Sequence, residues 1–283
     1  MILQFDTMLG NLHTHTNFSD GSDFPEAYVN EAIRKGFSVL GFSDHSPIPL
    51  VNSFSIREGS LPEYCKAISS IQSSSLHLLL GLEYDYIPGL TRPVSDLRAS
   101  FPFDYIIGSV HLVRNAGHES VWFIDGPNRL SYDSGISDVF EGDVRKAVIT
   151  YWRQLQAMIL REQPDIIGHL DKIKMHNKDR FFQENEPWYV KLVDETLELI
   201  KQSGAVVEVN TRGIYKKRSD TLFPGPDILK KILHLQIPIT VTSDAHRPEE
   251  LAMGFPEAKT ILNTIGFRSE WSLGSTGWKE LPL

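Results

Sequence analysis

Seven short apolar segments alternate with helical segments along this chain, and this alternation constrains the fold more than any other feature. The predicted strands lie at about residues 10–14, 39–43, 77–82, 104–110, 165–168, 205–209 and 237–242, and the stretch 2–12 supplies the first of them. The predicted helices lie at 26–35, 61–75, 143–161, 186–202, 226–234 and 249–262. This alternation is typical of an α/β fold in which helices cover a parallel sheet. We find no linker and no internal repeat, so we expect one domain over residues 1–283.

Two histidines, His13 and His15, follow the first predicted strand with one residue between them. Residues i and i+2 of a strand point to the same side, so both imidazoles can reach one point at the strand end. Neutral imidazole binds Zn, Fe, Ni or Cu, and Asp20 offers a carboxylate oxygen in the following loop. The alternative is a polar strand end with two hydrogen-bonded histidines, which the remaining sequence disfavours.

Residues of the same kinds recur at or just beyond the C-terminal ends of the other predicted strands. The candidate metal ligands are His13, His15, Asp20, His45, Glu83, His111, His169, Asp244 and His246. In a closed β/α barrel the C-terminal strand ends converge, and functional residues collect there. One zinc-like ion takes about four protein ligands, so this set suffices for two or three metal ions with a bridging carboxylate.

The motifs that contain these residues resemble those of the PHP (polymerase and histidinol phosphatase) superfamily. The motifs are His13-Thr14-His15, Ser19-Asp20-Gly21, Ser43-Asp44-His45, Gly81-Leu82-Glu83, Gly108-Ser109-Val110-His111, Gly168-His169-Leu170-Asp171 and Thr242-Ser243-Asp244-Ala245-His246. The resemblance runs from about residue 10 to 255, and segments 166–171 and 208–211 are most similar to those of histidinol-phosphatases. It implies a distorted (β/α)7 barrel with a trinuclear metal site at the C-terminal ends of the strands.

Carried over to this sequence, the resemblance implies three divalent metal ions. The first would be held by His13, His15, Glu83 and Asp244. Glu83 would bridge to a second ion, which His111 and His169 also hold, and a third would take Asp20, His45 and His246. Imidazole and carboxylate ligands together suit several metals, which leaves zinc, iron and manganese open.

The resemblance also implies hydrolysis of a small phosphate monoester. The expected reaction converts L-histidinol phosphate to L-histidinol and phosphate, a step of histidine biosynthesis. A metal ion lowers the pKa of bound water from 15.7 to about 7, so a hydroxide that bridges two metals can attack phosphorus. We expect Glu83, Asp244 and His246 to take part in catalysis.

Other functions stay open at this point. The same site could act on a nucleotide, an oligonucleotide or phosphotyrosine. PHP domains attached to DNA polymerases offer a further alternative, a non-catalytic metal-binding module. A metal-dependent amidohydrolase would also use histidines at strand ends, but such enzymes typically contain a carboxylated lysine, and no predicted strand here ends in lysine.

Cationic residues near the strand ends are candidates for binding the substrate phosphate. Arg212 follows the predicted strand at 205–209 and can donate charge-assisted hydrogen bonds to phosphate oxygens. Lys174 and His176 follow the strand that ends at His169 and are further candidates.

The segment 112–141 is long and lacks a clear hydrophobic period. Loops of this length in a compact domain are usually functional. Asp125 in this segment can pair with a substrate ammonium group, and Trp122 and Phe123 can stack on an imidazole or attract a cation. We therefore expect this segment to select the substrate.

Composition narrows the class of partner and the compartment. A net charge of -8 argues against nucleic-acid partners and anionic membranes, whereas a small anionic substrate can be bound by local cations and metals. The single cysteine, Cys65, excludes an internal disulfide and fits a reducing compartment. We find no signal peptide and no apolar run of membrane-spanning length. We expect a cytoplasmic protein.

Overall fold

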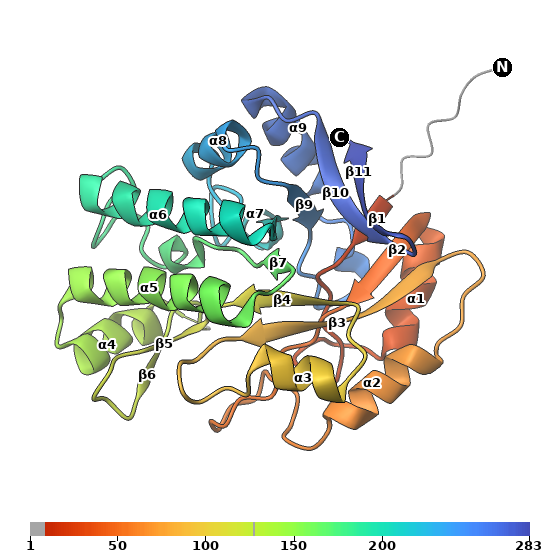
Figure 1. Cartoon of the computed structure of the whole chain (residues 1–283), viewed down its shortest axis with the longest axis horizontal. Helices are drawn as coiled ribbons and strands as arrows, with labels where there is room; N and C mark the ends of the chain where they lie inside the picture. Colours follow the sequence, from red (N-terminus) through yellow and green to blue (C-terminus); the bar gives the residue numbers. More distant parts are fainter. Residues whose placement is uncertain (1–8, 127) are drawn as a thin grey trace.

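Seven parallel strands form a nearly closed barrel in the computed structural model, which describes residues 9–126 and 128–283 (Figure 1). The strands pair in the order β1 (Leu9–Asn11), β2 (Phe37–Phe42), β3 (His77–Asp85), β4 (Tyr105–Ser109), β7 (Ile166–Ile167), β8 (Val206–Asn210) and β9 (Ile239–Thr242). Each of them overlaps a predicted strand, so the predicted α/β barrel is confirmed. Residues 2–8 of the first predicted stretch lie outside the described residues.

The first and last strands of the barrel meet just beyond their C-terminal ends. The backbone N–H of His15 donates to the carbonyl of Ala245 (2.8 Å), and the N–H of Ala245 donates to the carbonyl of His13 (3.1 Å). This parallel bridge, centred on Thr14 and Ala245, joins the chain after β1 to the chain after β9. It places the two N-terminal histidines beside the loop that carries Asp244.

Helices surround the barrel (Figure 1). They are α1 (Pro25–Arg34), α2 (Leu61–Ser70), α3 (Val94–Ser100), α4 (Arg129–Phe140), α5 (Val144–Glu162), α6 (Pro187–Ser203), α7 (Arg212–Tyr215), α8 (Pro226–His234) and α9 (Phe255–Ile265). Proline begins α1, α6 and α8, where the missing N–H is not needed. The helix predicted at 249–262 is a 3₁₀ turn (Pro248–Glu250) followed by α9, because Gly254 between them adopts φ 79°. None of the helices in the described part of the chain has the length and apolar character needed to cross a membrane.

The segment 112–141, in which the sequence shows no period, contains regular structure. β5 (Leu112–Arg114) pairs antiparallel with β6 (Val121–Phe123), and α4 follows. The side chain of Asn128 caps this helix by accepting the N–H of Ser131 (3.0 Å). Strands of three residues are too short to display alternation, and in α4 the apolar Leu130 is exposed, away from the face that buries Tyr132, Ile136, Val139 and Phe140.

The C-terminal residues form a hairpin of β10 (Ser269–Gly274) and β11 (Gly277–Pro282). Leu273 and Trp278 pack against the apolar cluster formed by Leu12, Val39, Leu79, Tyr105, Ile107 and Ile166. Glu270 on β10 accepts the backbone N–H of Val241 on β9 (3.1 Å). The hairpin therefore stabilises the junction between the first and last strands of the barrel.

Candidate metal centre

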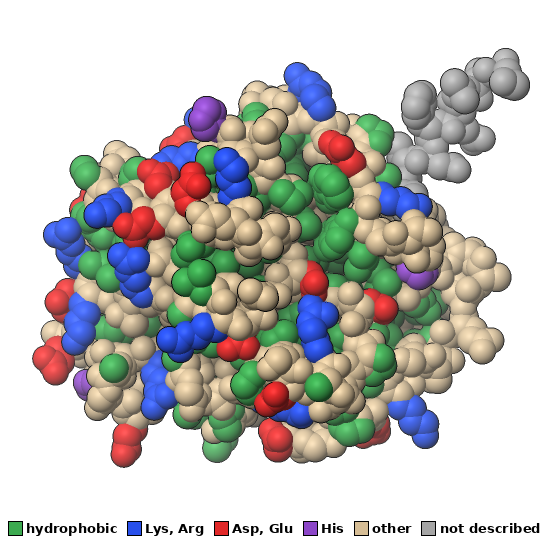
Figure 2. Space-filling model, in the orientation of Figure 1, with side chains coloured by type: hydrophobic (Ala, Val, Ile, Leu, Met, Phe, Trp, Pro, Cys, Tyr) green, Lys and Arg blue, Asp and Glu red, His purple; other side chains and the backbone are tan. Residues whose placement is uncertain are grey.

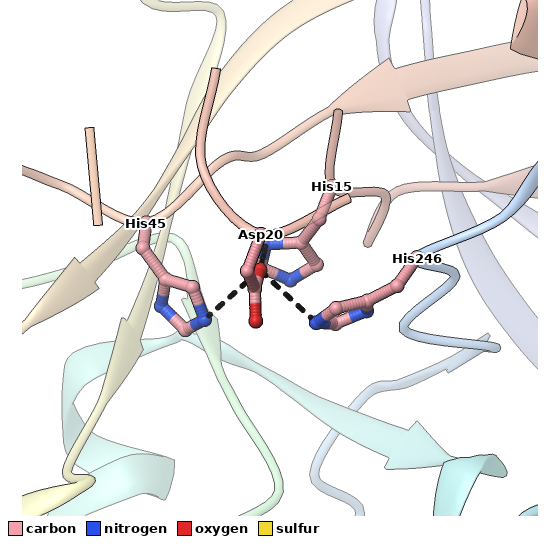
Figure 3. Close-up of side chains that lie close together, drawn as sticks. All are labelled: His15, Asp20, His45 and His246. Carbon is pink, nitrogen blue, oxygen red and sulfur yellow. Dashed lines mark ion pairs between the residues drawn. The ribbon is translucent and has the colours of Figure 1, made fainter. Parts of the chain in front are cut away.

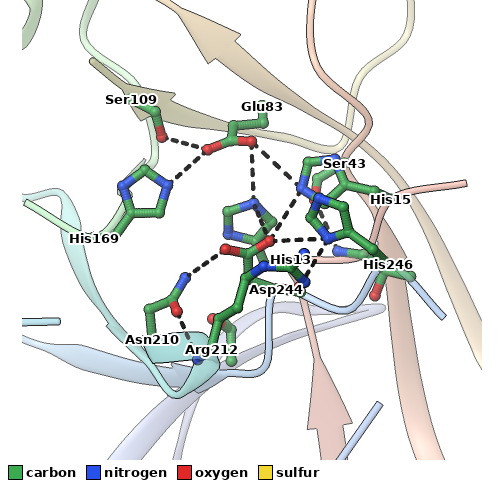
Figure 4. A network of polar contacts seen from close by, with 12 residues as sticks. His13, His15, Ser43, Glu83, Ser109, His169, Asn210, Arg212, Asp244 and His246 are labelled. Atoms are coloured by element: carbon green, nitrogen blue, oxygen red, sulfur yellow. Dashed lines mark hydrogen bonds and ion pairs between the residues drawn. The ribbon is translucent and has the colours of Figure 1, made fainter. Parts of the chain in front are cut away.

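The nine candidate ligands meet at the C-terminal ends of the barrel strands, in and beside a cavity of about 290 Å³. Figures 3 and 4 show these side chains, except that of His111, converging from strands and loops far apart in the sequence. The residues brought together are His13, His15, Asp20, His45, Glu83, His111, His169, Asp244 and His246. Seven of them are buried; only Asp20 and His246 reach solvent appreciably. The prediction that they share one site follows from parallel strands ending at a common edge.

Glu83 lies at the centre of this cluster (Figure 4). Its Oε2 atom is 3.3 Å from Nε2 of His13 and 3.4 Å from Nε2 of His15. Its Oε1 atom is 3.0 Å from Nε2 of His169 and accepts a hydrogen bond from the hydroxyl of Ser109 (2.7 Å). The two oxygens of one carboxylate thus face two different sets of imidazoles, which is the arrangement that a bridging ligand requires.

A second group of side chains surrounds Asp20 at the mouth of the cavity (Figure 3). Oδ1 of Asp20 is 3.2 Å from Nε2 of His246, 3.7 Å from Nδ1 of His15 and 4.0 Å from Nε2 of His45. The potential ligand atoms of these four residues lie within 4.8 Å of one another. Three imidazoles and one carboxylate at this spacing form a donor set that suits a divalent metal ion.

Asp244 connects the two groups. Its Oδ1 atom is 3.4 Å from Nε2 of His15 and 3.4 Å from Nδ1 of His246, and its Oδ2 atom accepts a hydrogen bond from Asn210 (3.2 Å). The backbone of Asp244 is left-handed at φ 50°, a conformation that is uncommon outside glycine. Nδ1 of His246 donates to the carbonyl of Asp244 (3.0 Å), which leaves Nε2 of this imidazole facing Asp20.

Asp85, which the sequence analysis missed, lies between two of the candidate ligands. Its Oδ2 atom is 2.9 Å from Nδ1 of His45, and its Oδ1 atom accepts a short hydrogen bond from Nδ1 of His111. The Nε2 atoms of both rings are therefore free to face the centre. The signal was present in the sequence, because Asp85 follows Glu83 by two positions on β3 and so points to the same side.

Glu208 on β8 has the same role on the other side of the centre, and the sequence analysis also missed it. Oε1 of this buried carboxylate contacts Nδ1 of His13, and Oε2 accepts the backbone N–H of His169 (2.6 Å). The hydroxyl of Thr242 donates to it as well (2.6 Å). A glutamate inside an apolar strand needs partners of this kind, and that requirement marked it as part of the site.

Burial and charge prepare the cluster for cations. Nε2 of His13 and Nε2 of His15 are buried without a hydrogen-bond partner among the described residues. Burial lowers the pKa of His15 to about 3, helped by the positive charges of His246 and His45, so this imidazole is neutral and can bind a metal. Burial alone would raise the pKa of Glu83, but His45, His13 and His111 hold it well below its usual value. Unpaired imidazole nitrogens beside an ionised carboxylate fit a bound divalent ion.

The four residues predicted to bind substrate take different positions. Arg212 and Asp125 line the cavity, as does Lys172, which the sequence analysis did not single out. Lys174 does not line this cavity, and its Nζ atom is 2.6 Å from Oδ2 of Asp171. His176 hydrogen-bonds through Nε2 to the carbonyl of Gly126 (2.9 Å) and lies behind the cavity wall.

Two aromatic rings from separate segments, the end of β6 and the loop after β2, form one wall of the cavity. Phe123 lines it as predicted and stacks on Phe54, with ring centroids 5.4 Å apart. Phe54 also lies edge-on to His45 at 5.1 Å. Trp122 is fully buried, and its indole N–H donates to the carbonyl of Tyr132 (3.0 Å), so Phe54, and not Trp122, lies beside Phe123 in the cavity wall.

Comparison with known proteins shows relatives along most of the chain. A Deinococcus radiodurans protein with the name "Probable histidinol-phosphatase" is 28% identical over 269 residues, covering 93% of this chain and 96% of that protein. The histidinol-phosphatase of Bacillus subtilis is 24% identical over 263 residues, covering 86% and 95%. A crystal structure of the Lactococcus lactis histidinol phosphate phosphatase, complexed with zinc, L-histidinol and phosphate, has the same fold. It matches with a TM-score of 0.68 at 21% identity, covering 95% of this chain and 98% of that chain.

The PHP domain family model matches residues 11–212, a range that begins just before His13 and ends at Arg212. This range contains seven of the nine candidate ligands, and Asp244 and His246 join them through the barrel closure beyond β9. The protein therefore belongs to the PHP domain family.

Proposed function

We propose that this protein hydrolyses L-histidinol phosphate to L-histidinol and phosphate, a step of histidine biosynthesis, with the aid of bound divalent metal ions. The chain is a phosphoric monoester hydrolase, as its relatives along almost its whole length are. One observation carries the finer proposal: the two oxygens of Glu83 face separate imidazole sets at the base of a cavity of about 290 Å³. A cavity of this size suits a small ester.

The proposed metal centre holds three divalent ions. One set of ligands is His13, His15, Glu83 and Asp244, the second is Glu83, His111 and His169, and the third is Asp20, His45 and His246. Close-packed donor groups in the structure support each set, and His15 also borders the third. Zinc is our first choice because the Lactococcus lactis enzyme was crystallised with it, and iron and manganese suit the same donors. Ions bound here would supply an activated water and neutralise charge on phosphoryl oxygens.

Residues of the chain itself orient the substrate in this proposal. The cavity lining includes Arg212, whose guanidinium can donate to a phosphate oxygen, and Asp125, which can pair with the ammonium of histidinol phosphate. Phe54 and Phe123 offer aromatic surface for the imidazole. Glu83, Asp244 and His246 lie where the reacting phosphate would meet the metals, which supports their proposed catalytic roles.

Polynucleotide substrates are less well supported. On the face drawn in Figure 2, Lys and Arg side chains are interspersed with Asp and Glu and do not form one basic stripe. The net charge of -8 points the same way, since binding to nucleic acid depends on clustered cations. We also propose that the enzyme acts in the cytoplasm, because its one cysteine, Cys65, is buried and free.

Steady-state kinetics on a panel of phosphate monoesters tests the proposal. The protein would be purified without chelator and supplied with Zn²⁺, Mn²⁺ or Fe²⁺ in turn. We expect kcat/KM for L-histidinol phosphate to exceed that for p-nitrophenyl phosphate by about a hundred-fold, as two polar recognition contacts would produce. Equal kcat/KM for the two esters would reject histidinol phosphate as the substrate. A higher kcat/KM for nucleotides than for histidinol phosphate would favour a nucleotide phosphatase.

A further inference from the structure

Lys172 is a buried cation in the wall of the cavity, three residues after His169, with only 4% of its surface exposed. Its Nζ atom is 3.5 Å from Oδ2 of Asp125 and 3.6 Å from Oδ2 of Asp244. Both distances exceed the usual range of N–H···O hydrogen bonds, about 2.7–3.2 Å. By contrast, Nζ of Lys174 is held at 2.6 Å by Asp171. Charge attraction therefore places Lys172 in the site without using up its hydrogen-bond donors.

Asp125 is loosely paired in the same way. Besides Lys172, its Oδ2 atom has a neighbour in Nε2 of His111 at 3.8 Å. Its Oδ1 atom is buried and has no hydrogen-bond partner among the described residues. A buried carboxylate oxygen without a donor is costly, so this side chain has the capacity to accept from a ligand.

Lys172 and Asp125 form one pair of opposite charges in the cavity wall, and each side chain can make further hydrogen bonds. We propose that Lys172 and Asp125 are an exchange pair that a zwitterionic substrate separates: the phosphate accepts from Lys172 and an ammonium group donates to Asp125. This inference rests on the proposed phosphatase function and narrows its substrates to monoesters that carry a primary amine a few bonds from the phosphate.

Charge balance explains why such a pair would select substrates. A substrate that carries both a phosphate and an ammonium group gives Lys172 a new negative partner and Asp125 a new positive partner. Neither buried charge is then left unpaired. A phosphate ester without an amine would draw Lys172 away and leave Oδ2 of Asp125 facing the His111 ring, which carries no charge as a metal ligand. Leaving a buried charge unpaired is expensive, so the pair penalises the wrong ester as well as favouring the right one.

Arg212 is a poorer candidate for this exchange because one end of its guanidinium is already fixed to the loop that carries Asp244. Its Nη1 atom donates to the carbonyl of Asp244 (2.6 Å) and is 3.5 Å from Oε2 of Glu250. Among the described residues, Nζ of Lys172 has no such bond to the backbone, and it lies 5.8 Å from the centre of the Phe223 ring. Lys172 can therefore change partner without displacing the loop that carries Asp244.

Two esters that differ only in the amine, 2-aminoethyl phosphate and ethyl phosphate, isolate the effect. With the zinc-loaded protein we expect kcat/KM to be at least about ten-fold higher for the amine ester. Asp125→Asn should bring this ratio close to one through loss on the amine ester. Lys172→Met should raise KM for both esters by about ten-fold, and Lys172→Arg should restore most of the loss. Asp133→Asn and Lys201→Met serve as matched controls, because both residues lie outside the cavity lining.

Calorimetric binding of inorganic phosphate and of L-histidinol, with metal content measured on each variant, gives a readout independent of turnover. Lys172→Met should weaken phosphate binding and Asp125→Asn should weaken L-histidinol binding, each by about ten-fold at unchanged metal content. If the wild type hydrolyses histidinol phosphate but the ester ratio is one, or survives Asp125→Asn, the exchange pair is overturned while the proposed function stands. If no ester is hydrolysed, the proposed function fails. Unchanged phosphate binding in Lys172→Met would separately overturn the role of Lys172 in the exchange pair.

Discussion

Glu208 holds His13 by its Nδ1 atom although the two residues are 195 positions apart in the chain. The contact turns the Nε2 atom of His13 toward Glu83, 3.3 Å away. This Nε2 atom has no hydrogen-bond partner among the described residues. Metal-binding histidines are commonly oriented in this way by a carboxylate on the second nitrogen. The geometry of the candidate centre thus depends on a residue that does not itself reach the cavity.

Glu208→Gln should weaken metal binding by about ten- to a hundred-fold while the protein stays folded. The amide keeps the size of the side chain but cannot accept from His13, His169 and Thr242 together as the carboxylate does. Competition with a chromophoric chelator measures the affinity, and circular dichroism monitors folding. Wild-type affinity in this variant would show that the orientation of His13 does not limit metal binding.

Asp85→Asn should affect two ligand groups at once. The carboxylate contacts Nδ1 of His45 and Nδ1 of His111. The Nε2 atom of His45 faces Asp20, and the Nε2 atom of His111 faces Glu83. An amide can accept at only one oxygen, so one of the two imidazoles loses its support. We expect at least one metal equivalent to be lost, measured by elemental analysis after gel filtration. Asp138→Asn, on α4 outside the cavity lining, is the matched control.

Protein purified without chelator should contain about three metal equivalents, and Glu83→Gln should lose both metal and turnover. Glu83 faces both imidazole sets, so the amide removes a charge that two ions would share. The loss should exceed that of any single histidine variant. A fully active wild type with one equivalent would contradict the trinuclear arrangement, and a wild-type rate in Glu83→Gln would contradict the bridge.

Metal uptake should release protons and weaken as the pH falls. Burial alone would lower the pKa of His45, but the charges of Glu83 and Asp85 raise it to about 10. Asp125 and Asp85 likewise outweigh burial and raise the pKa of His111 to about 9. Both rings are therefore protonated at pH 7.5 before a metal binds, and each must lose its proton to become a ligand.

Calorimetric zinc titrations of chelator-treated protein, in buffers of different ionisation enthalpy, measure this release. We expect about three protons per fully loaded protein at pH 7.5, because the charges of Glu208 and Glu83 also outweigh burial and raise the pKa of His13 well above its usual value. The apparent affinity should decrease between about pH 9 and pH 6 as protons compete for the rings. Zinc binding that is independent of pH over this range would show that His45 and His111 are not ligands.

Arg212→Ala should reduce kcat/KM by about ten- to a hundred-fold through loss of a charge-assisted hydrogen bond to phosphate. We expect metal content to be unchanged, because Asn210 still holds the carboxylate of Asp244 after the guanidinium bond to its carbonyl is lost. Arg212→Lys separates charge from geometry and should recover only part of the rate. An unaltered kcat/KM would leave Arg212 with a purely structural role.

The sequence predicted the barrel and the ligand cluster because both depend on strong, regular signals. Seven apolar strands and their polar ends can be identified residue by residue, and parallel pairing brings those ends together. Glu208 was missed because it lies inside a strand, where apolar neighbours hide a polar residue that supports a ligand. Asp85, the last residue of β3, was missed because the predicted strand ended at residue 82, so that its side chain was not placed on the same face as Glu83. Lys172 was missed because the 3₁₀ turn Lys172–Lys174 decides which of its two lysines faces the cavity, and no hydrophobic period marks such a turn.

The bridge between Thr14 and Ala245 has a consequence for the order in which this enzyme can be made. Ligands from the first strand end cannot meet those after β9 until β9 and Ala245 have left the ribosome. Contacts of such long sequence separation form slowly, since closing a large loop comes before any of them is gained. The hairpin β10–β11, which follows β9 in the chain, packs on this same junction. The complete cluster therefore assembles only after every strand of the barrel has been synthesised, and the ligands of the first strand must wait for those of the last.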